Sequence, residues 1–243
     1  MDIAAGGVLL GNGDGTFQGI PLGATPSAPT YAAIGDFDKN STIDVAALSD
    51  SSLYILSNSG AGKLTLTHTY ALQEPGYGIV TADFNGDGNL DLLVVQTNPI
   101  TQLWGYSILL GNGDGSFQAP VFYPQGAQTA ASEYSIVVAD FNNDHKMDVA
   151  IMPREGGSLE VLLGNGDGTF ASPVGYYDRG FPSLVADFNG DGKLDIAAGG
   201  FDLASTPLTP RDSDTFRKWR WHFPSRGLPH KPKRFCGHLH GGS

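Results

Sequence analysis

Apolar and polar residues alternate along residues 1–200 in short runs rather than at helical spacing. One stretch shows the unit: apolar runs at 77–82, 92–95 and 106–110 are separated by Asp/Asn/Gly-rich segments, and a fourth run follows around 117–123. Short apolar runs bounded by turn residues predict β-strands. Asn-Gly and Asp-Gly dipeptides favour hairpin turns, because both residues tolerate positive φ. The pattern therefore predicts units of four short antiparallel strands and no helices up to residue 200.

An Asp-rich segment recurs four times and aligns without gaps. Each copy follows the pattern of ADFNGDGNLD at 82–91, with a phenylalanine after the first aspartate and an aspartate at the end. The first aspartates of the copies are 47, 57 and 47 residues apart; they are Asp36, Asp83, Asp140 and Asp187. Self-similarity over such distances is the sequence signature of a repeat architecture.

A second motif, LLGNGDG followed by Thr or Ser and then Phe, comes two apolar runs after the Asp-rich segment. Its complete copies lie at 9–17, 109–117 and 162–170, and residues 58–64 resemble a degenerate copy. Four-stranded units repeated in this way form the blades of a β-propeller. We expect an all-β fold of four-stranded antiparallel blades. Its whole blades are expected at 31–75, 76–129 and 130–178, with part of a blade at each end. The predicted propeller is incomplete, with about four blades' worth of sequence.

The hexapeptide Asp-Ile-Ala-Ala-Gly-Gly occurs at both 2–7 and 195–200. The chain therefore starts at the last position of an Asp-rich loop and leaves the repeat register after Gly200. Either the two part blades close a small ring, with two copies of one strand competing for one position, or the propeller stays open. An open propeller leaves sheet edges uncovered, which favours further blades in a longer chain or self-association.

Each Asp-rich loop presents oxygen atoms at regular spacing, counted from its first aspartate as position 1. Side chains at positions 1, 3 and 5, the backbone carbonyl at 7 and an aspartate at 9 follow the ligand order of an EF-hand loop, in which glycine at 6 makes the sharp turn. A set of oxygen donors alone favours Ca²⁺ over Zn²⁺. The candidate metal ligands are Asp36, Asp38, Asn40, Thr42 and Asp44; Asp83, Asn85, Asp87, Asn89 and Asp91; Asp140, Asn142, Asp144, Lys146 and Asp148; and Asp187, Asn189, Asp191, Lys193 and Asp195.

These loops differ from EF-hands after position 9, where apolar residues continue as a strand and no glutamate stands at position 12. Ordinary Asp/Asn/Gly turns are the other interpretation, but four copies with the same phenylalanine and final aspartate favour calcium. We expect a positive φ at position 6, which favours glycine there. That position is Ser41 in one loop and His145 in another, and histidine tolerates such an angle better than serine. We therefore expect the loops at Asp83 and Asp187 to bind most tightly and the Asp36 loop most weakly. The GNGDG segments are interpreted as hairpins rather than metal sites.

The residue at position 2 lies between two ligands, so its side chain points away from the ion. We expect these four phenylalanines to be buried between neighbouring blades, with the apolar residues at position 8 covering the other side of the loop. The phenylalanines are Phe37, Phe84, Phe141 and Phe188, and the covering residues are Ile43, Leu90, Met147 and Leu194.

Charge is distributed unevenly. Residues 1–200 hold 22 acidic and 6 basic side chains, whereas residues 201–243 hold 3 acidic and 8 basic ones. The excess of acidic side chains in residues 1–200 disfavours binding of nucleic acid and favours binding of a divalent cation. The single cysteine, Cys236, allows no intrachain disulfide and no thiolate metal site. No apolar run is long enough for a membrane span, and no signal peptide is visible at the start.

Residues 201–243 abandon the repeat and collect basic and aromatic residues, including four of the six histidines. One interpretation is a tail that binds an acidic partner or a membrane surface. We favour the other, a disordered or non-native end, because the repeat register breaks directly after a perfect copy of the hexapeptide. The expected division is therefore a repeat domain at 1–200 and a basic tail at 201–243.

The Asp-rich loops and the LLGNGDG turns together resemble FG-GAP (VCBS-type) repeats, over residues 2 to about 200. Such repeats are known from integrin α-subunit propellers, some fungal lectins and large bacterial secreted proteins. The resemblance implies a calcium-stabilised β-propeller that is secreted or on the cell surface. The chain departs from the family in its number of blades.

Two functions fit this resemblance. The first is a binding module for adhesion, with an extracellular protein or a glycan as partner. The alternative is a structural fragment of a larger secreted protein or enzyme whose active part is absent. We do not expect an enzyme in this chain, since the repeat domain contains only His68 and His145 and shows no nucleophile elbow, HExxH motif or phosphate-binding loop.

Overall fold

The computed structural model of the chain describes residues 3–4, 7–11, 13–21, 25–60, 63–101, 103–127, 133–153, 159–176 and 181–199. Every element in this part is a β-strand, and no helix in it could cross a membrane. The predicted basic tail at 201–243 lies outside the described residues.

Three whole blades account for most of the strands, and each is an antiparallel sheet whose strand order follows the chain. The first blade contains β4 (Tyr31–Gly35), β5 (Asp44–Ser49), β6 (Ser52–Asn58) and β7 (Leu64–Ala71). The second contains β8 (Gly76–Ala82), β9 (Asp91–Thr97), β10 (Leu103–Leu109) and β11 (Val121–Ala127). The third contains β12 (Tyr134–Ala139), β13 (Asp148–Pro153), β14 (Leu159–Leu162) and β15 (Val174–Tyr176). The predicted blade boundaries are thus confirmed.

Two smaller sheets flank the whole blades. At one end β1 (Ile3–Ala4), β2 (Gly7–Gly11) and β3 (Phe17–Pro21) form a three-stranded sheet. At the other, β16 (Phe181–Ala186) pairs with β17 (Asp195–Gly199). By position in the repeat, β16 and β17 are the first two strands of a blade, and β1 to β3 are the last three.

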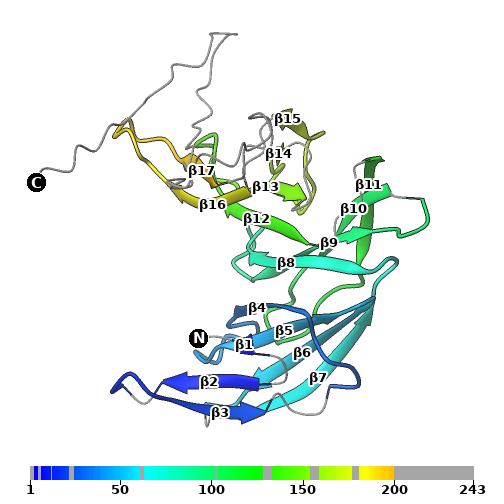
Figure 1. The fold of residues 1–243 in the computed structure, drawn as a ribbon, viewed down its shortest axis with the longest axis vertical. Coiled ribbons are helices and arrows are strands. Elements are labelled where there is room, and N and C mark those ends of the chain that lie inside the picture. Colours follow the sequence, from blue (N-terminus) through cyan, green and yellow to red (C-terminus); the bar gives the residue numbers. More distant parts are fainter. Residues whose placement is uncertain are drawn as a thin grey trace, which may run out of the picture.

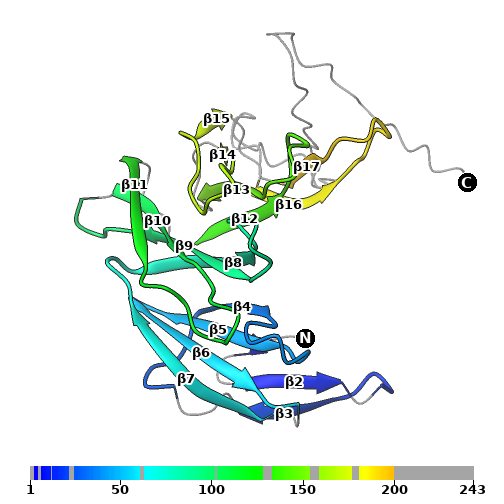
Figure 2. The same ribbon diagram turned by 180° about the vertical axis from the view of Figure 1, so that it is seen from behind.

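The sheets follow one another along an open row, with β1–β3 and β16–β17 at opposite ends (Figures 1 and 2). The first strands of successive blades lie side by side: β4 contacts β8, β8 contacts β12, and β12 contacts β16. This is the arrangement of a propeller, and the prediction of an incomplete one is confirmed. The two end sheets do not pair with each other in the described part of the chain, so it does not form the closed four-bladed ring considered above.

Three of the four apolar clusters in the described part of the chain lie between neighbouring sheets, and the fourth lies within the first blade. Leu48 of β5 shares one cluster with Leu92 and Val94 of β9, and Leu93 of β9 shares the next with Ile151 of β13. Each second strand of a whole blade is buried along its entire length, because both faces of its sheet are covered. A blade therefore depends on its neighbours for stability.

Candidate metal centre

Each Asp-rich loop connects the first and second strands of a blade and is held by its own side chains. In the second blade, the Asp83 carboxylate accepts hydrogen bonds from the backbone N–H groups of Gly86 (2.7 Å) and Gly88 (2.9 Å). The Asn85 side-chain oxygen accepts one from the Asp87 N–H (2.9 Å). The bonds from the N–H of position 6 to the position-1 carboxylate and from the N–H of position 5 to the position-3 side chain recur in the other three loops. The aspartates and asparagines thus fold the loop by capping its own backbone.

Positions 4 and 6 of all four loops have positive φ. At position 6 the angles are 67° at Ser41 and 64° at His145, against 81° at Gly88 and 80° at Gly192. The expectation of positive φ at position 6 is confirmed. Position 4 behaves in the same way, with Lys39 at 58°, and the sequence analysis did not anticipate this. The signal was present, since two of the four loops carry glycine at position 4.

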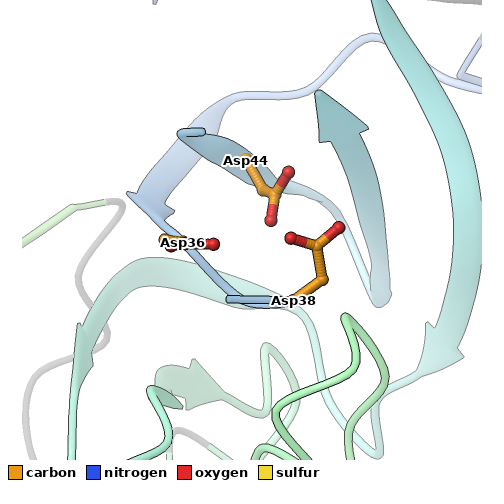
Figure 3. Close-up of side chains that lie close together, drawn as sticks. All are labelled: Asp36, Asp38 and Asp44. Carbon is orange, nitrogen blue, oxygen red and sulfur yellow. The ribbon is translucent and has the colours of Figure 1, made fainter. Parts of the chain in front are cut away.

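One loop brings three carboxylates together. Asp36 follows β4, Asp44 begins β5, and Asp38 lies between them; one oxygen from each lies within 4.8 Å of the other two. Figure 3 shows the three side chains directed toward a common space. Two oxygens bound to one Ca²⁺ at 2.3–2.6 Å can be no more than about 5.2 Å apart, so this trio fits a single calcium ion.

The other loops carry a carboxylate at position 5 instead of position 3, and none of them forms such a trio in the described part of the chain. Their side chains occupy equivalent places, and their carboxylates accept loop N–H groups. Backbone N–H groups, that of Gly192 foremost, lower the pKa of Asp187. The Asn89 N–H likewise lowers the pKa of Asp87. Every predicted ligand therefore sits in its predicted loop, but the carboxylates converge most closely at Asp36.

The aspartate at position 9 has a structural partner that the sequence analysis missed. Asp91 is fully buried, and its two oxygens accept the N–H groups of Phe84 (2.8 Å) and Gly111 (2.8 Å). Asp44 and Asp148 make the same pair of bonds in their blades. In all three, burial raises the pKa of the carboxyl group, and the nearby loop aspartates add to the effect. This carboxylate joins the Asp-rich loop to the turn between the third and fourth strands.

The turn between the third and fourth strands also covers the Asp-rich loop of the preceding blade. The Gly115 N–H donates to the Phe37 carbonyl (2.9 Å), and the Gly168 N–H donates to the Phe84 carbonyl (3.1 Å). The phenylalanine that ends the turn packs on the same residue: the ring centroids of Phe37 and Phe117 are 5.3 Å apart. The GNGDG segments close hairpins, as expected, since Gly111 pairs with Phe117. They also join neighbouring blades.

This contact explains where the prediction for the phenylalanines holds and where it is wrong. Phe37 and Phe84 are only 3% and 2% exposed, because the turn of the next blade covers them. Phe141 is half-buried, and Phe188 is 45% exposed. The described residues provide no following turn for either of these rings. Of the position-8 residues expected to cover the loop, Leu90 is half-buried, whereas Ile43, Met147 and Leu194 are exposed.

Residues 36–94 match the family model of the FG-GAP-like repeat. This segment is similar to the FG-GAP-like repeat. The match runs from Asp36 through the first blade and into β9. The matched segment thus includes the first two Asp-rich loops, and the same loop recurs in the third blade and between β16 and β17.

No curated protein matches the chain. A lectin of Agrocybe aegerita, solved for its specific recognition of non-reducing terminal N-acetylglucosamine, is similar in structure with a TM-score of 0.50 and 20% identity. The match covers 79% of this chain and 55% of the lectin, so the chain spans about half the lectin's length. A Tc holotoxin pore of Photorhabdus luminescens matches with a TM-score of 0.46 and 17% identity, over 82% of this chain and 10% of the toxin chain. The similarity to the lectin supports the propeller fold of this chain.

Proposed function

We propose that this chain is a calcium-binding β-propeller module that acts outside the cell by binding a glycan or a protein, without catalysis. The FG-GAP-like repeat and the lectin-like fold support a carbohydrate- or protein-binding module. The observation that carries the calcium proposal is the convergence of Asp36, Asp38 and Asp44 in a loop that the chain repeats four times. Repetition of one ligand order argues for a shared role of the loops.

Calcium would be held by the carboxylates together with the carbonyl at position 7, and it would neutralise their mutual repulsion. We expect up to four ions per chain, one for each loop. The geometry favours the Asp36 loop as the tightest site, because three carboxylates already meet there. This reverses the order expected from the sequence, which weighed the backbone at position 6 and not the distance between carboxylates.

Calorimetric titration of the full chain with Ca²⁺ tests this proposal. Asp38→Asn should weaken the tightest site, because it removes one of the three converging carboxylates. Asp167→Asn is the matched control for the Asp36 site, since Asp167 lies in the GNGDG turn that covers the Asp83 loop, and its carboxylate accepts bonds from the Thr169 N–H and hydroxyl. Absence of calcium uptake, or a preference for Zn²⁺, would contradict the proposal.

A glycan and matrix-protein array, probed with and without calcium, tests the binding role. Terminal N-acetylglucosamine is the first sugar to include, because the structurally similar lectin recognises it. We expect a ligand whose binding is lost in chelator. Calcium uptake with no ligand on either array would instead favour the alternative, a structural unit of a larger secreted protein.

A further inference from the structure

The edge of β17 is the place where a further strand fits the repeat. In each whole blade the second strand pairs with both the first and the third. Among the described residues, β17 pairs with β16 alone. The strand that fits its other edge is a third strand followed by a GNGDG turn, and the chain has one such segment outside the whole blades: β2, the turn at 11–17, and β3.

The pairing of β1 with β2 differs by one residue from the register of the whole blades. In whole blades, the residue after the position-9 aspartate pairs with the first leucine of LLGNGDG, as Val149 pairs with Leu162. The equivalent residue of β1, Ile3, pairs with Val8 instead of Leu9. A slip of one residue turns every side chain of a strand to the other face of the sheet. Among the described residues, β1 contributes two to the pairing with β2, whereas β17 has five residues of the same Asp-Ile-Ala-Ala-Gly sequence.

Asp195 gives a second and independent indication. The position-9 aspartates of the whole blades each accept two N–H groups, one from the loop and one from the start of the following turn. In the described residues, Asp195 accepts the loop N–H of Phe188 (3.0 Å) and makes no bond to a turn. The group that would complete the pair is the backbone N–H of a glycine equivalent to Gly111 or Gly164, and Gly11 has that position in the first turn.

We propose that β17 of one molecule pairs with β2 of a second copy, in the register of the whole blades, so that the two copies share a blade. Ile196 would face Leu9, Ala197 would face Val8, and Asp195 would accept the Gly11 N–H of the partner copy. The shared blade then contains β16 and β17 from one copy and β2 and β3 from the other. In the shared blade, β17 of one copy replaces β1 of the other as the partner of β2, and the two strands have the same sequence.

The shared blade also covers Phe141. In the whole blades the third glycine of the turn donates its N–H to the loop phenylalanine of the preceding blade. By the same relation the Gly15 N–H of the partner would reach the Phe141 carbonyl. A Cβ built on Gly15 meets nothing within 4 Å, in contrast to Gly115, where Asp38 lies 3.3 Å away. The first turn therefore has room on the face that the other turns use for blade contact.

A second copy is the occupant that requires no rearrangement of the whole blades. The end sheets lie at opposite ends of the row, with three whole blades between them (Figure 2). Two copies joined at both ends would contain six whole and two shared blades, eight in all, which is within the four to eight blades that propellers contain. Heterologous contacts of this kind close into rings when the rotation permits.

Disulfide trapping in the full chain tests the pairing and its register. The variant Val8→Cys/Ala197→Cys, in a Cys236→Ser background, should form an interchain disulfide on mild oxidation and run as a covalent dimer or larger species on non-reducing gels. Gly7→Cys/Ala197→Cys is the matched control, because residue 7 faces the opposite side in the proposed register and should not crosslink. Each single-cysteine variant should remain monomeric on the gel.

Three results would overturn the proposal: an intrachain disulfide between residues 8 and 197, free thiols in the double variant, or crosslinking at residue 7 instead of 8. Light scattering on the unmodified chain gives a test without substitutions, in which we expect the mass of two chains. A monomer at the concentrations used for trapping would contradict the shared blade.

Discussion

At the scale of single residues, the loops show what one backbone angle requires. Positions 4 and 6 have positive φ in every copy, whether the residue is glycine or not. Such angles crowd the Cβ atom of an ordinary residue, whereas glycine adopts them freely. The loops with Ser41 and His145 therefore hold the same shape at a higher conformational cost than the loops with Gly88 and Gly192.

Ser41→Gly should stabilise the chain. Relief of the left-handed angle is worth roughly 1 kcal/mol in the free energy of unfolding, measured by denaturant titration in chelator. Gly88→Ser is the matched reverse change, and it should cost a similar amount, since a Cβ at Gly88 meets nothing within 4 Å and only the backbone is affected. A loss of stability in Ser41→Gly would show that the serine side chain, not its φ, matters.

Asp91→Ala should destabilise the second blade whether or not calcium is present. It leaves the N–H groups of Phe84 and Gly111 without their buried acceptor, and each such loss costs about 1–3 kcal/mol. Thermal unfolding in calcium and in chelator should show the loss in both. A loss confined to calcium would mean that Asp91 acts as a metal ligand alone.

At the scale of elements, the unit of stability is the contact between a loop and the next blade's turn. Phe84 lies against Phe170 with ring centroids 5.5 Å apart, and Phe170 also packs on Tyr106 of β10.

Gly111 and Gly164 admit no side chain, since an added Cβ would lie 2.2 Å and 2.3 Å from the Leu90 and Met147 carbonyl oxygens. The glycines of the turn therefore permit its close approach to the loop of its own blade.

Phe84→Ala should cost about 3–5 kcal/mol, the range for truncating a buried aromatic ring. Phe188→Ala, the same change at the same loop position, should cost clearly less, because Phe188 is 45% exposed. Denaturant titration of both variants checks the comparison. Equal losses would contradict the conclusion that the following turn is what buries the ring. In the proposed assembly the first blade of the partner copy would follow the loop of Phe188, so the titration is run at a chain concentration at which light scattering gives the mass of a monomer.

The burial of Tyr106 in β10 predicts how the stability of the chain changes at alkaline pH. Burial, with a smaller effect of Tyr123, raises the pKa of Tyr106 to about 12 from its ordinary 10.0. Because the folded state holds this proton more tightly, its contribution to stability is complete below pH 10 and is lost as the pH rises toward 12. Unfolding of Tyr106→Phe should lack this component between pH 10 and 12. An unchanged pH profile would exclude Tyr106 as its source.

At the scale of the whole molecule, the core between blades links each loop to the stability of the row. Asp87→Ala removes an exposed carboxylate of the second loop, so it should lower the melting temperature in calcium and change little in excess chelator. The reason is mass action, since calcium stabilises only the state that binds it. Equal losses in both conditions would mean that Asp87 acts through turn geometry.

The sequence by itself determined the repeating unit. The spacing of Asp-rich loops and GNGDG turns located the blades at 31–75, 76–129 and 130–178, and the strands of the structure lie within these bounds, at 31–71, 76–127 and 134–176. The same spacing assigned each candidate ligand to its loop. It did so because strand alternation and the turn residues are local properties of the backbone. The positive φ at position 6 of the Asp-rich loops was predicted for the same reason, because φ preferences belong to single residues.

The tertiary structure decided what the repeats do to one another. The second role of Asp91, the burial of Phe84 and the exposure of Phe188 depend on which turn lies over which loop, and no local pattern encodes that relation. Contacts between segments distant in sequence are fixed only when the blades stack, because the apolar faces that bring them together belong to different blades.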